Sequence, residues 1–235
     1  TTITMALLDH PQYDSDTFSS IRTMFNVAPE DVLVKMQERM PHTSQITGFG
    51  MTETGGSVCL GETTAPLEQR SQTCGKAFPG NEIRIQDPTT GEFVGPGVKG
   101  EIITRGLGVF SGYHNDEAKN AEAFDDDGWF HTGDLGEMTA NDEVIYSGRL
   151  KDMLKVGGEN VAAVEVEGFL CTHPKVKIAA VVGLPDEKYT EVPVAFIETL
   201  ADEFLTEDEV IDYCRNQISS YKIPRHVRFI TEWPM

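Results

Sequence analysis

The length of its apolar segments limits the folds open to this chain. The longest clean apolar stretch, residues 178–184, is long enough for one β-strand. A membrane-spanning helix needs about 18 such residues in succession, so the core must be built from short helices and strands. The 235 residues suffice for one large domain or two smaller ones, at roughly 100–200 residues per domain.

Charge argues against whole classes of partner. The sequence contains 38 Asp and Glu against 19 Lys and Arg, a formal net charge of −19 at pH 7. A surface of this sign repels phosphate backbones and anionic lipids, which argues against nucleic-acid and membrane binding. A phosphorylated small molecule remains an acceptable ligand where basic residues gather locally. The sequence leaves the oligomeric state open.

The cysteines favour a reducing compartment. They are Cys59, Cys74, Cys171 and Cys214, and no pair has the Cys-x-x-Cys spacing of a metal or redox motif. We expect reduced thiols packed as small apolar side chains in a cytoplasmic protein. The six histidines are scattered and match no zinc or hydrolytic-triad pattern.

The rhythm of the sequence changes near residues 149–152. Before this point, residues 29–40 predict a helix with Pro29 in its first turn, and residues 75–149 predict short strands and turns. After it, we expect a hairpin over 153–161 with glycines at its turn, a helix at 163–171, and strands at 176–184 and 192–198. A second helix should begin at a capping box formed by Thr206 and Glu209, with Ile211, Cys214 and Ile218 as its apolar stripe. A last strand should lie around Val227 and Phe229.

The predicted fold is therefore mixed α/β and α+β in more than one domain. Residues 1–149 form the larger part, divided into an α/β piece at 1–60 and a β-rich part at 61–149 that resembles a small distorted barrel. Residues 150–235 form a small α+β domain. We find no internal repeat and no low-complexity segment.

The first segment with chemical potential is Gly-Phe-Gly-Met-Thr-Glu-Thr-Gly-Gly at residues 48–56. Small residues let backbone N–H groups approach an anion, and Thr52 adds a hydroxyl donor. Glu53 is suited to Mg²⁺, which prefers carboxylate and phosphate oxygens, and Phe49 is suited to stacking on a purine. The alternative is a glycine-rich turn between a strand and a loop with incidental polar residues.

A second segment is Gly-Trp-Phe-His-Thr-Gly-Asp-Leu-Gly at residues 128–136. An aspartate between glycines, Asp134, can accept two hydrogen bonds from a vicinal diol such as ribose. The alternative is an ordinary turn aspartate. The acidic run at 125–127 just upstream lacks the later Glu of an EF-hand, so a solvated loop is the better interpretation.

Basic residues gather after Gly148. Arg149, Lys151 and Lys155 lie within a short stretch of a chain that has twice as many acids as bases. An arginine can make fork-like bonds to adjacent oxygens and a lysine is a mobile point charge, so the cluster suits phosphate or ribose recognition. A second basic cluster near the end comprises Lys222, Arg225, His226 and Arg228; an anion site and a solvated strand edge remain equal interpretations of it.

These segments occur in an order that resembles the adenylate-forming superfamily, which includes acyl-CoA synthetases, peptide-synthetase adenylation domains and firefly luciferase. The motifs are the two above, Gly-Glu-Ile-Ile-Thr-Arg-Gly at 100–106 with Gly112-Tyr113, Gly-Arg-Leu-Lys-Asp-Met-Leu-Lys-Val-Gly-Gly-Glu-Asn-Val at 148–161 and Tyr-Lys-Ile-Pro at 221–224. The resemblance covers essentially the whole chain. It implies a large AMP-binding domain followed by a small mobile domain that swings between two half-reactions.

The resemblance also implies an activity. A carboxylic acid reacts with ATP to give acyl-AMP and pyrophosphate, and a thiol, usually that of coenzyme A, then displaces AMP. We expect an ATP-dependent carboxylic acid–CoA ligase of the fatty- or aryl-acid type, with ATP/AMP, Mg²⁺ and CoA as ligands. An adenylation domain that loads a carrier protein and a nucleotide-binding pseudoenzyme are the alternatives.

Roles follow residue by residue from the resemblance. At the nucleotide, Thr52 would bind phosphate, Glu53 would hold Mg²⁺ and Phe49 would pack on adenine. Ala28 would lie in the adenine-contact segment, Gly48 would bind the nucleotide, and Asp134 and Arg149 would hold the ribose hydroxyls. At the thiol, Lys155 would enter the site in the thioester-forming orientation and Gly157 and Gly158 would flank the pantetheine channel. Lys151 would be the hinge, and Gly50, Met51, Gly56 and Ser57 would line the acyl pocket.

Two parts of the family pattern are expected outside this stretch. The Ser/Thr/Gly-rich loop that cradles the triphosphate would precede Thr1, and the adenylation lysine would follow Met235, so we interpret the chain as a piece of a longer protein. Such preorganised charges usually supply the largest catalytic contribution.

We therefore predict that the 235-residue chain alone has negligible adenylation activity. Acid-dependent exchange between ATP and pyrophosphate measures this directly, and robust exchange would refute the prediction.

Overall fold

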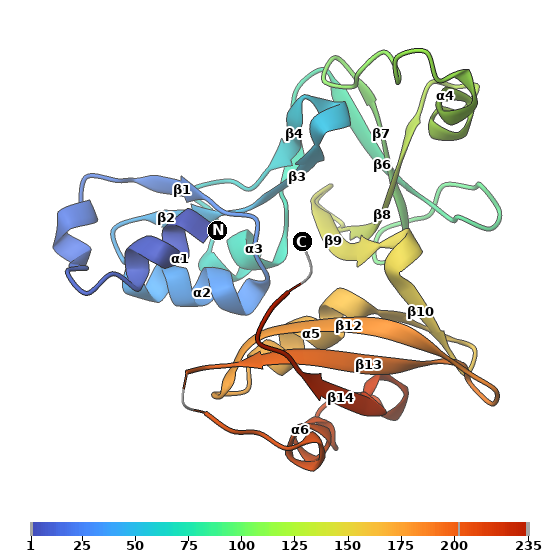
Figure 1. Ribbon diagram of the computed structural model, residues 1–235. Coiled ribbons are helices and arrows are strands. Elements are labelled where there is room, and N and C mark those ends of the chain that lie inside the picture. Colours follow the sequence, from blue (N-terminus) through green and yellow to red (C-terminus); the bar gives the residue numbers. More distant parts are fainter. Residues whose placement is uncertain (1, 202, 234–235) are drawn as a thin grey trace. The chain divides into compact units, whose positions relative to one another are not determined.

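The computed structural model describes residues 2–201 and 203–233, and their contacts divide the chain into two compact units after Tyr146 (Figure 1). This division falls inside a strand, just before the boundary predicted at 149–152. Among the described helices, none is long and apolar enough to cross a bilayer.

The first unit begins with a small α/β layer. Its elements are α1 (Thr2–Leu8), the 3₁₀ helix η1 (Ser15–Phe18), β1 (Thr23–Phe25), α2 (Glu30–Arg39) and β2 (Ser44–Ile46), and β1 pairs with β2 in parallel. The predicted helix at 29–40 is confirmed as α2, with Pro29 at its N-cap and acidic residues in its first turn. Leu8, Met36 and Met40 form the core beneath it.

Two sheets enclose the core of the β-rich part. One has the order β3 (Gly48–Met51), β4 (Gly56–Leu60), β5 (Lys76–Ala77), and the other β6 (Asn81–Gln86), β7 (Gly100–Gly106), β8 (Phe130–Met138), β9 (Val144–Arg149). Backbone bonds tie Cys74 and Gly75 to Val144, and the sheets share one apolar cluster. The predicted β-rich character is confirmed, and the distorted barrel stays a prediction.

The subdivision at residue 60 differs from the prediction. Strands β3 and β4, expected in the α/β piece, belong to the β-rich part because β4 pairs with β5 and Phe49 and Val58 share a core with Ile85 and Ile102. Two short helices, α3 (Leu67–Gln72) and α4 (Glu117–Ala123), were not predicted from the sequence.

The second unit is an α+β domain around one sheet (Figure 1). Its elements are η3 (Leu150–Asp152), β10 (Met153–Val156), β11 (Glu159–Ala162), α5 (Ala163–Cys171), β12 (Val176–Asp186), β13 (Thr190–Thr199), α6 (Glu207–Cys214), η4 (Ser220–Lys222) and β14 (His226–Phe229). The order is β11-β10-β13-β12, and β14 pairs in parallel with β13.

Local signals in this second unit are confirmed. The hairpin turns at Gly157 and Gly158, both with positive φ, and the capping box joins Thr206 to Glu209. The predicted apolar stripe is confirmed: Cys214 is buried, and Ile211 and Ile218 pack partly buried against the same core. Val210 of α6, which was not predicted, is also buried there.

Burial holds three thiols in their protonated form. Cys59, Cys74 and Cys214 are buried and Cys171 is half-buried, and none of these four residues forms a disulfide. Loss of hydration raises the pKa of Cys59 to about 12 and the pKa values of Cys74 and Cys214 to about 11.

We predict that iodoacetamide at pH 8 modifies Cys171 well before the three buried thiols, measured by peptide mass spectrometry, because alkylation needs an accessible thiolate. Equal labelling of Cys59 and Cys171 in the native protein would contradict this.

Burial of these thiols also predicts a pH dependence of stability. Above pH 9 the unfolded chain loses thiol protons that the native state keeps. The free energy of unfolding, measured in urea, should therefore decline as pH rises from 9 toward 11.

Candidate active site

The segment at 48–56 is a tight strand-to-strand connection. It runs from β3 through η2 (Thr52–Thr54) into β4, with Gly55 and Gly56 in positive φ. The buried Thr54 hydroxyl accepts from the Met51 N–H at 2.9 Å and donates to the Gly56 carbonyl at 2.7 Å. Thr54, which the sequence analysis did not single out, therefore closes the loop and leaves Thr52 on the exposed surface.

Glu53 is held from two directions. The Tyr113 hydroxyl donates to its carboxylate at 3.0 Å, and its backbone carbonyl accepts from the Phe110 N–H at 2.8 Å. Burial, together with the bond to Glu53, raises the pKa of Tyr113, so the phenol stays a hydrogen-bond donor. The Glu53 carboxylate is thereby held in place by Tyr113.

This donor set fits Mg²⁺. The ion is commonly held by one or two carboxylates together with substrate phosphates, and Glu53 with Thr52 supplies hard oxygen donors of that kind. Among the described residues no group of three His, Cys, Asp or Glu side chains forms a complete metal cage. A shared site of protein and phosphate oxygens is the arrangement these residues favour.

Phe49 and Gly50 have structural roles that the motif alone did not predict. Phe49 is 6% exposed and its ring lies 6.0 Å from that of Tyr146, so most of its surface is committed to the protein core. A Cβ at Gly50 would lie 1.9 Å from the Gly56 carbonyl oxygen. Glycine at 50 is therefore required by the neighbouring strand, and its part in an acyl pocket stays a prediction.

Asp134 and Arg149 lie in different compact units. Asp134 is buried, 3% exposed, in the middle of β8. Arg149 is exposed at the end of β9, the neighbouring strand, beyond the division at Tyr146. Contacts of both side chains with one ribose therefore depend on the position of the second unit, and this shared role stays a prediction.

The loop before α2 carries the remaining adenine candidate. Ala28 is half-buried there. Its neighbour Asn26 is buried, accepts from the Thr4 hydroxyl at 2.7 Å and donates to Gln45 at 3.0 Å. Asn26 thus contributes to the interior of the α/β layer.

In the second unit, the thiol-side candidates surround one hairpin. Lys155 is exposed on β10; its ammonium contacts Asn160 and its backbone N–H donates to Glu191 at 2.7 Å. The Gly157 N–H donates to the Tyr189 carbonyl at 2.7 Å, and a Cβ at Gly157 would lie 3.2 Å from that ring. Lys151 is exposed in η3.

The second basic cluster is largely engaged within the protein. Lys222 pairs with Glu165, the His226 ring lies 3.8 Å from Glu207, and the Arg225 guanidinium lies 5.3 Å from the Tyr189 ring centre. These contacts favour the interpretation as a structured strand edge over an anion site.

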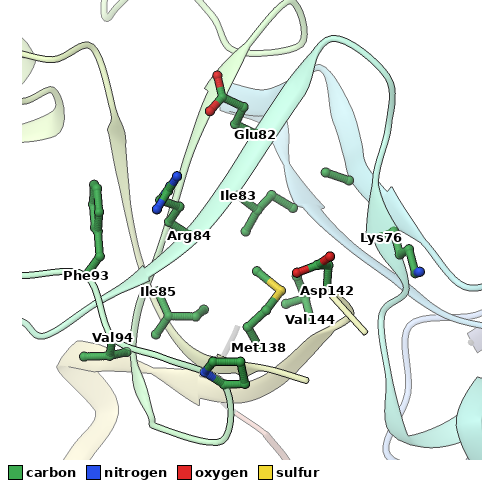
Figure 2. Close-up of a pocket in the computed structure, with 12 residues that line it drawn as sticks. Lys76, Glu82, Ile83, Arg84, Ile85, Phe93, Val94, Met138, Asp142 and Val144 are labelled. Atoms are coloured by element: carbon green, nitrogen blue, oxygen red, sulfur yellow. The ribbon is translucent and has the colours of Figure 1, made fainter. Parts of the chain in front are cut away.

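A cavity of about 470 Å³ lies elsewhere in the β-rich part (Figure 2). Apolar side chains of β6, β8 and β9 line it, with Lys76, Glu82, Arg84 and Asp142 as its charged residues. None of its lining residues is among the predicted site residues. The predicted chemistry therefore lies outside this cavity.

Comparison with known proteins bears on the resemblance. Residues 1–114 match the family of AMP-binding enzymes and residues 165–235 match the AMP-binding enzyme C-terminal domain. The chain belongs to the adenylate-forming superfamily. Separate matches thus confirm both parts of the resemblance, the AMP-binding part and the C-terminal domain.

Relatives from a plant and a fish are CoA ligases by name. The chain is 36% identical over 237 residues to 4-coumarate–CoA ligase 2 of Nicotiana tabacum, covering 99% of this chain and 44% of that protein. It is 33% identical to the mitochondrial medium-chain acyl-CoA ligase ACSF2 of Danio rerio, covering 100% and 39%. The chain therefore spans less than half the length of these relatives.

Solved structures agree with the fold. O-succinylbenzoate CoA synthetase (MenE) of Bacillus subtilis in complex with AMP has a TM-score of 0.85 and 30% identity, covering 99% of this chain and 46% of that one. The ATP-bound chimera B3 of RpMatB and BxBclM has a TM-score of 0.89 and 29% identity, with the same coverage.

Proposed function

We propose that the protein is an ATP-dependent carboxylic acid–CoA ligase acting on fatty or aryl acids. The observation that carries the proposal is identity of 33–36% along essentially the whole chain to proteins named as CoA ligases. In the first half-reaction an oxygen of the acid attacks the α-phosphorus of ATP and pyrophosphate leaves. In the second, the CoA sulfur attacks the acyl carbon, and AMP and the thiol proton leave.

The first unit supplies the nucleotide contacts in this proposal. The exposed Thr52 hydroxyl donates to a phosphate oxygen, and the Glu53 carboxylate, fixed by Tyr113, holds Mg²⁺. Bound Mg²⁺ supplies charge neutralisation at the phosphates. Asp134 accepts hydrogen bonds from the ribose hydroxyls. The adenine is bounded by Ala28, Gly48 and the uncovered edge of Phe49, and the acyl group by Gly50, Met51, Gly56 and Ser57.

The second unit supplies the thiol side. Arg149 joins Asp134 at the ribose, and rotation about Lys151 brings the hairpin of β10 and β11 to the acyl-adenylate. Lys155 then enters the site, and Gly157 and Gly158 leave a passage for the pantetheine arm. Positive φ at both glycines makes larger residues unfavourable there, whether or not a thiol passes.

The test is an assay of the longer protein that the resemblance implies, since the 235-residue chain alone is expected to lack adenylation activity. ATP, Mg²⁺, CoA and a panel of fatty and aryl acids are supplied, and thioesters are detected by mass spectrometry. Acyl-CoA formation is the expected result. A thioester formed only on a phosphopantetheinyl carrier protein would favour an adenylation domain, and nucleotide binding without any thioester would favour a pseudoenzyme. Four free cysteines support a reducing compartment, and we propose the cytoplasm.

A further inference from the structure

Strand β8 carries a bulge at the position of Asp134. Glu101 on β7 pairs with Leu135, but the next pair along is Ile103 with His131. Residues 132–134 of β8 therefore lie opposite Ile102 alone. Bulges of this kind redirect a side chain from the regular face of a sheet.

Two side chains hold the bulge in place of the missing ladder bonds. The Thr132 hydroxyl donates to the Ile102 carbonyl at 2.5 Å and accepts from the Asp134 N–H at 3.1 Å. The Glu101 carboxylate accepts from the Gly133 N–H at 2.9 Å. Gly133 has φ of +69°, a conformation that favours glycine.

The second oxygen of Glu101 is also engaged. It lies 3.0 Å from the His131 ring nitrogen, and the Glu101 side chain is only 9% exposed. Burying a carboxylate is costly unless hydrogen bonds replace its hydration, and here both oxygens are used within the bulge. Glu101 thus holds the Gly133 backbone on one side of Thr132 and the His131 ring on the other.

We propose that Glu101 and Thr132 are positioning residues that hold the β8 bulge so that Asp134 is presented to the ribose of a bound adenine nucleotide. This inference rests on the proposed nucleotide role of Asp134. It extends that role to two residues whose contacts lie entirely within the sheet.

The test compares AMP with 2′,3′-dideoxyadenosine 5′-monophosphate, which lacks both ribose hydroxyls, by calorimetric titration of the 235-residue chain. Thr132→Val keeps the shape of the side chain but removes both of its hydrogen bonds. We expect AMP affinity to fall about tenfold while affinity for the dideoxy nucleotide stays unchanged, as one or two lost hydrogen bonds imply. Thr132→Ser restores the hydroxyl and should restore the preference for AMP.

Thr104→Val is the matched control. Thr104 is fully buried on β7, and its hydroxyl donates to the Glu82 carbonyl at 2.9 Å, away from the bulge. This variant loses a comparable buried bond and should keep the preference for AMP. A drop in affinity for both nucleotides in Thr132→Val would indicate general disruption and would overturn the positioning role.

A second variant guards against misfolding of the first. Glu101→Gln keeps an oxygen for the Gly133 N–H but loses the charge, and we expect about a threefold loss of the preference for AMP. If wild-type protein binds AMP and both variants keep its preference, this inference is wrong while the proposed function stands. If the wild-type chain shows no preference for AMP over the dideoxy nucleotide, the proposed role of Asp134 fails, and this inference fails with it.

Discussion

Replacing Asp134 by alanine should lower the affinity of the chain for AMP by about 30- to 100-fold. A charge-assisted hydrogen bond from a ribose hydroxyl to a carboxylate is worth about 1.5–3 kcal/mol, and the expected loss corresponds to one such bond. Asp134 is almost fully buried in β8, so water replaces these contacts poorly. Calorimetric titration with AMP measures the loss.

Two variants make this result specific. Asp134→Asn keeps the shape and one acceptor oxygen and should lose about tenfold. Asp142→Asn changes an exposed acid of the same unit, at a positive φ that asparagine tolerates, and should bind AMP as the wild type does. AMP affinity of Asp134→Ala within threefold of the wild type would exclude Asp134 from the nucleotide site.

Replacing Gly50 by alanine should destabilise the first unit by about 3 kcal/mol. The new Cβ would lie 1.9 Å from the Gly56 carbonyl oxygen and 2.6 Å from the Ser57 Cα, and these backbone atoms of β4 have no alternative rotamer. Forcing atoms into a packed core typically costs 1–3 kcal/mol or more. Scanning calorimetry should show a melting temperature lower by roughly 10 °C.

Gly95→Ala is the control for this effect. No heavy atom lies within 4 Å of a Cβ built at Gly95, and its melting temperature should match that of the wild type. If Gly50→Ala is as stable as Gly95→Ala, then β3 and β4 are farther apart than the structure places them, and Gly50 would be free to serve an acyl pocket instead.

Features set by neighbouring residues were predicted well. The capping box at Thr206 needs only a hydroxyl and an acid three residues later, and the turn at Gly157 and Gly158 needs only two residues that accept positive φ. The helix α4 was missed because it is short and buries only Ala123, so it lacks the apolar stripe by which helices are recognised in a sequence.

Features set by distant residues were not predictable in the same way. The bulge at Asp134 depends on the register between β7 and β8, whose partners are about 30 residues apart. The motif indicated Asp134 but gave no reason to select Glu101 or Thr132, since their roles arise from that register. Likewise, the packing of Phe49 in the core depends on its ring contact with Tyr146, which is distant in the sequence.

The proposed function depends most on Asp134 and Arg149, from the two units, contacting the same ribose. The most direct measurement is a crystal structure of the chain with AMP. We expect the Asp134 carboxylate and the Arg149 guanidinium each to lie within about 3.2 Å of a ribose hydroxyl oxygen. AMP bound with ribose contacts from neither residue, or with Arg149 turned to solvent away from the nucleotide, would contradict it.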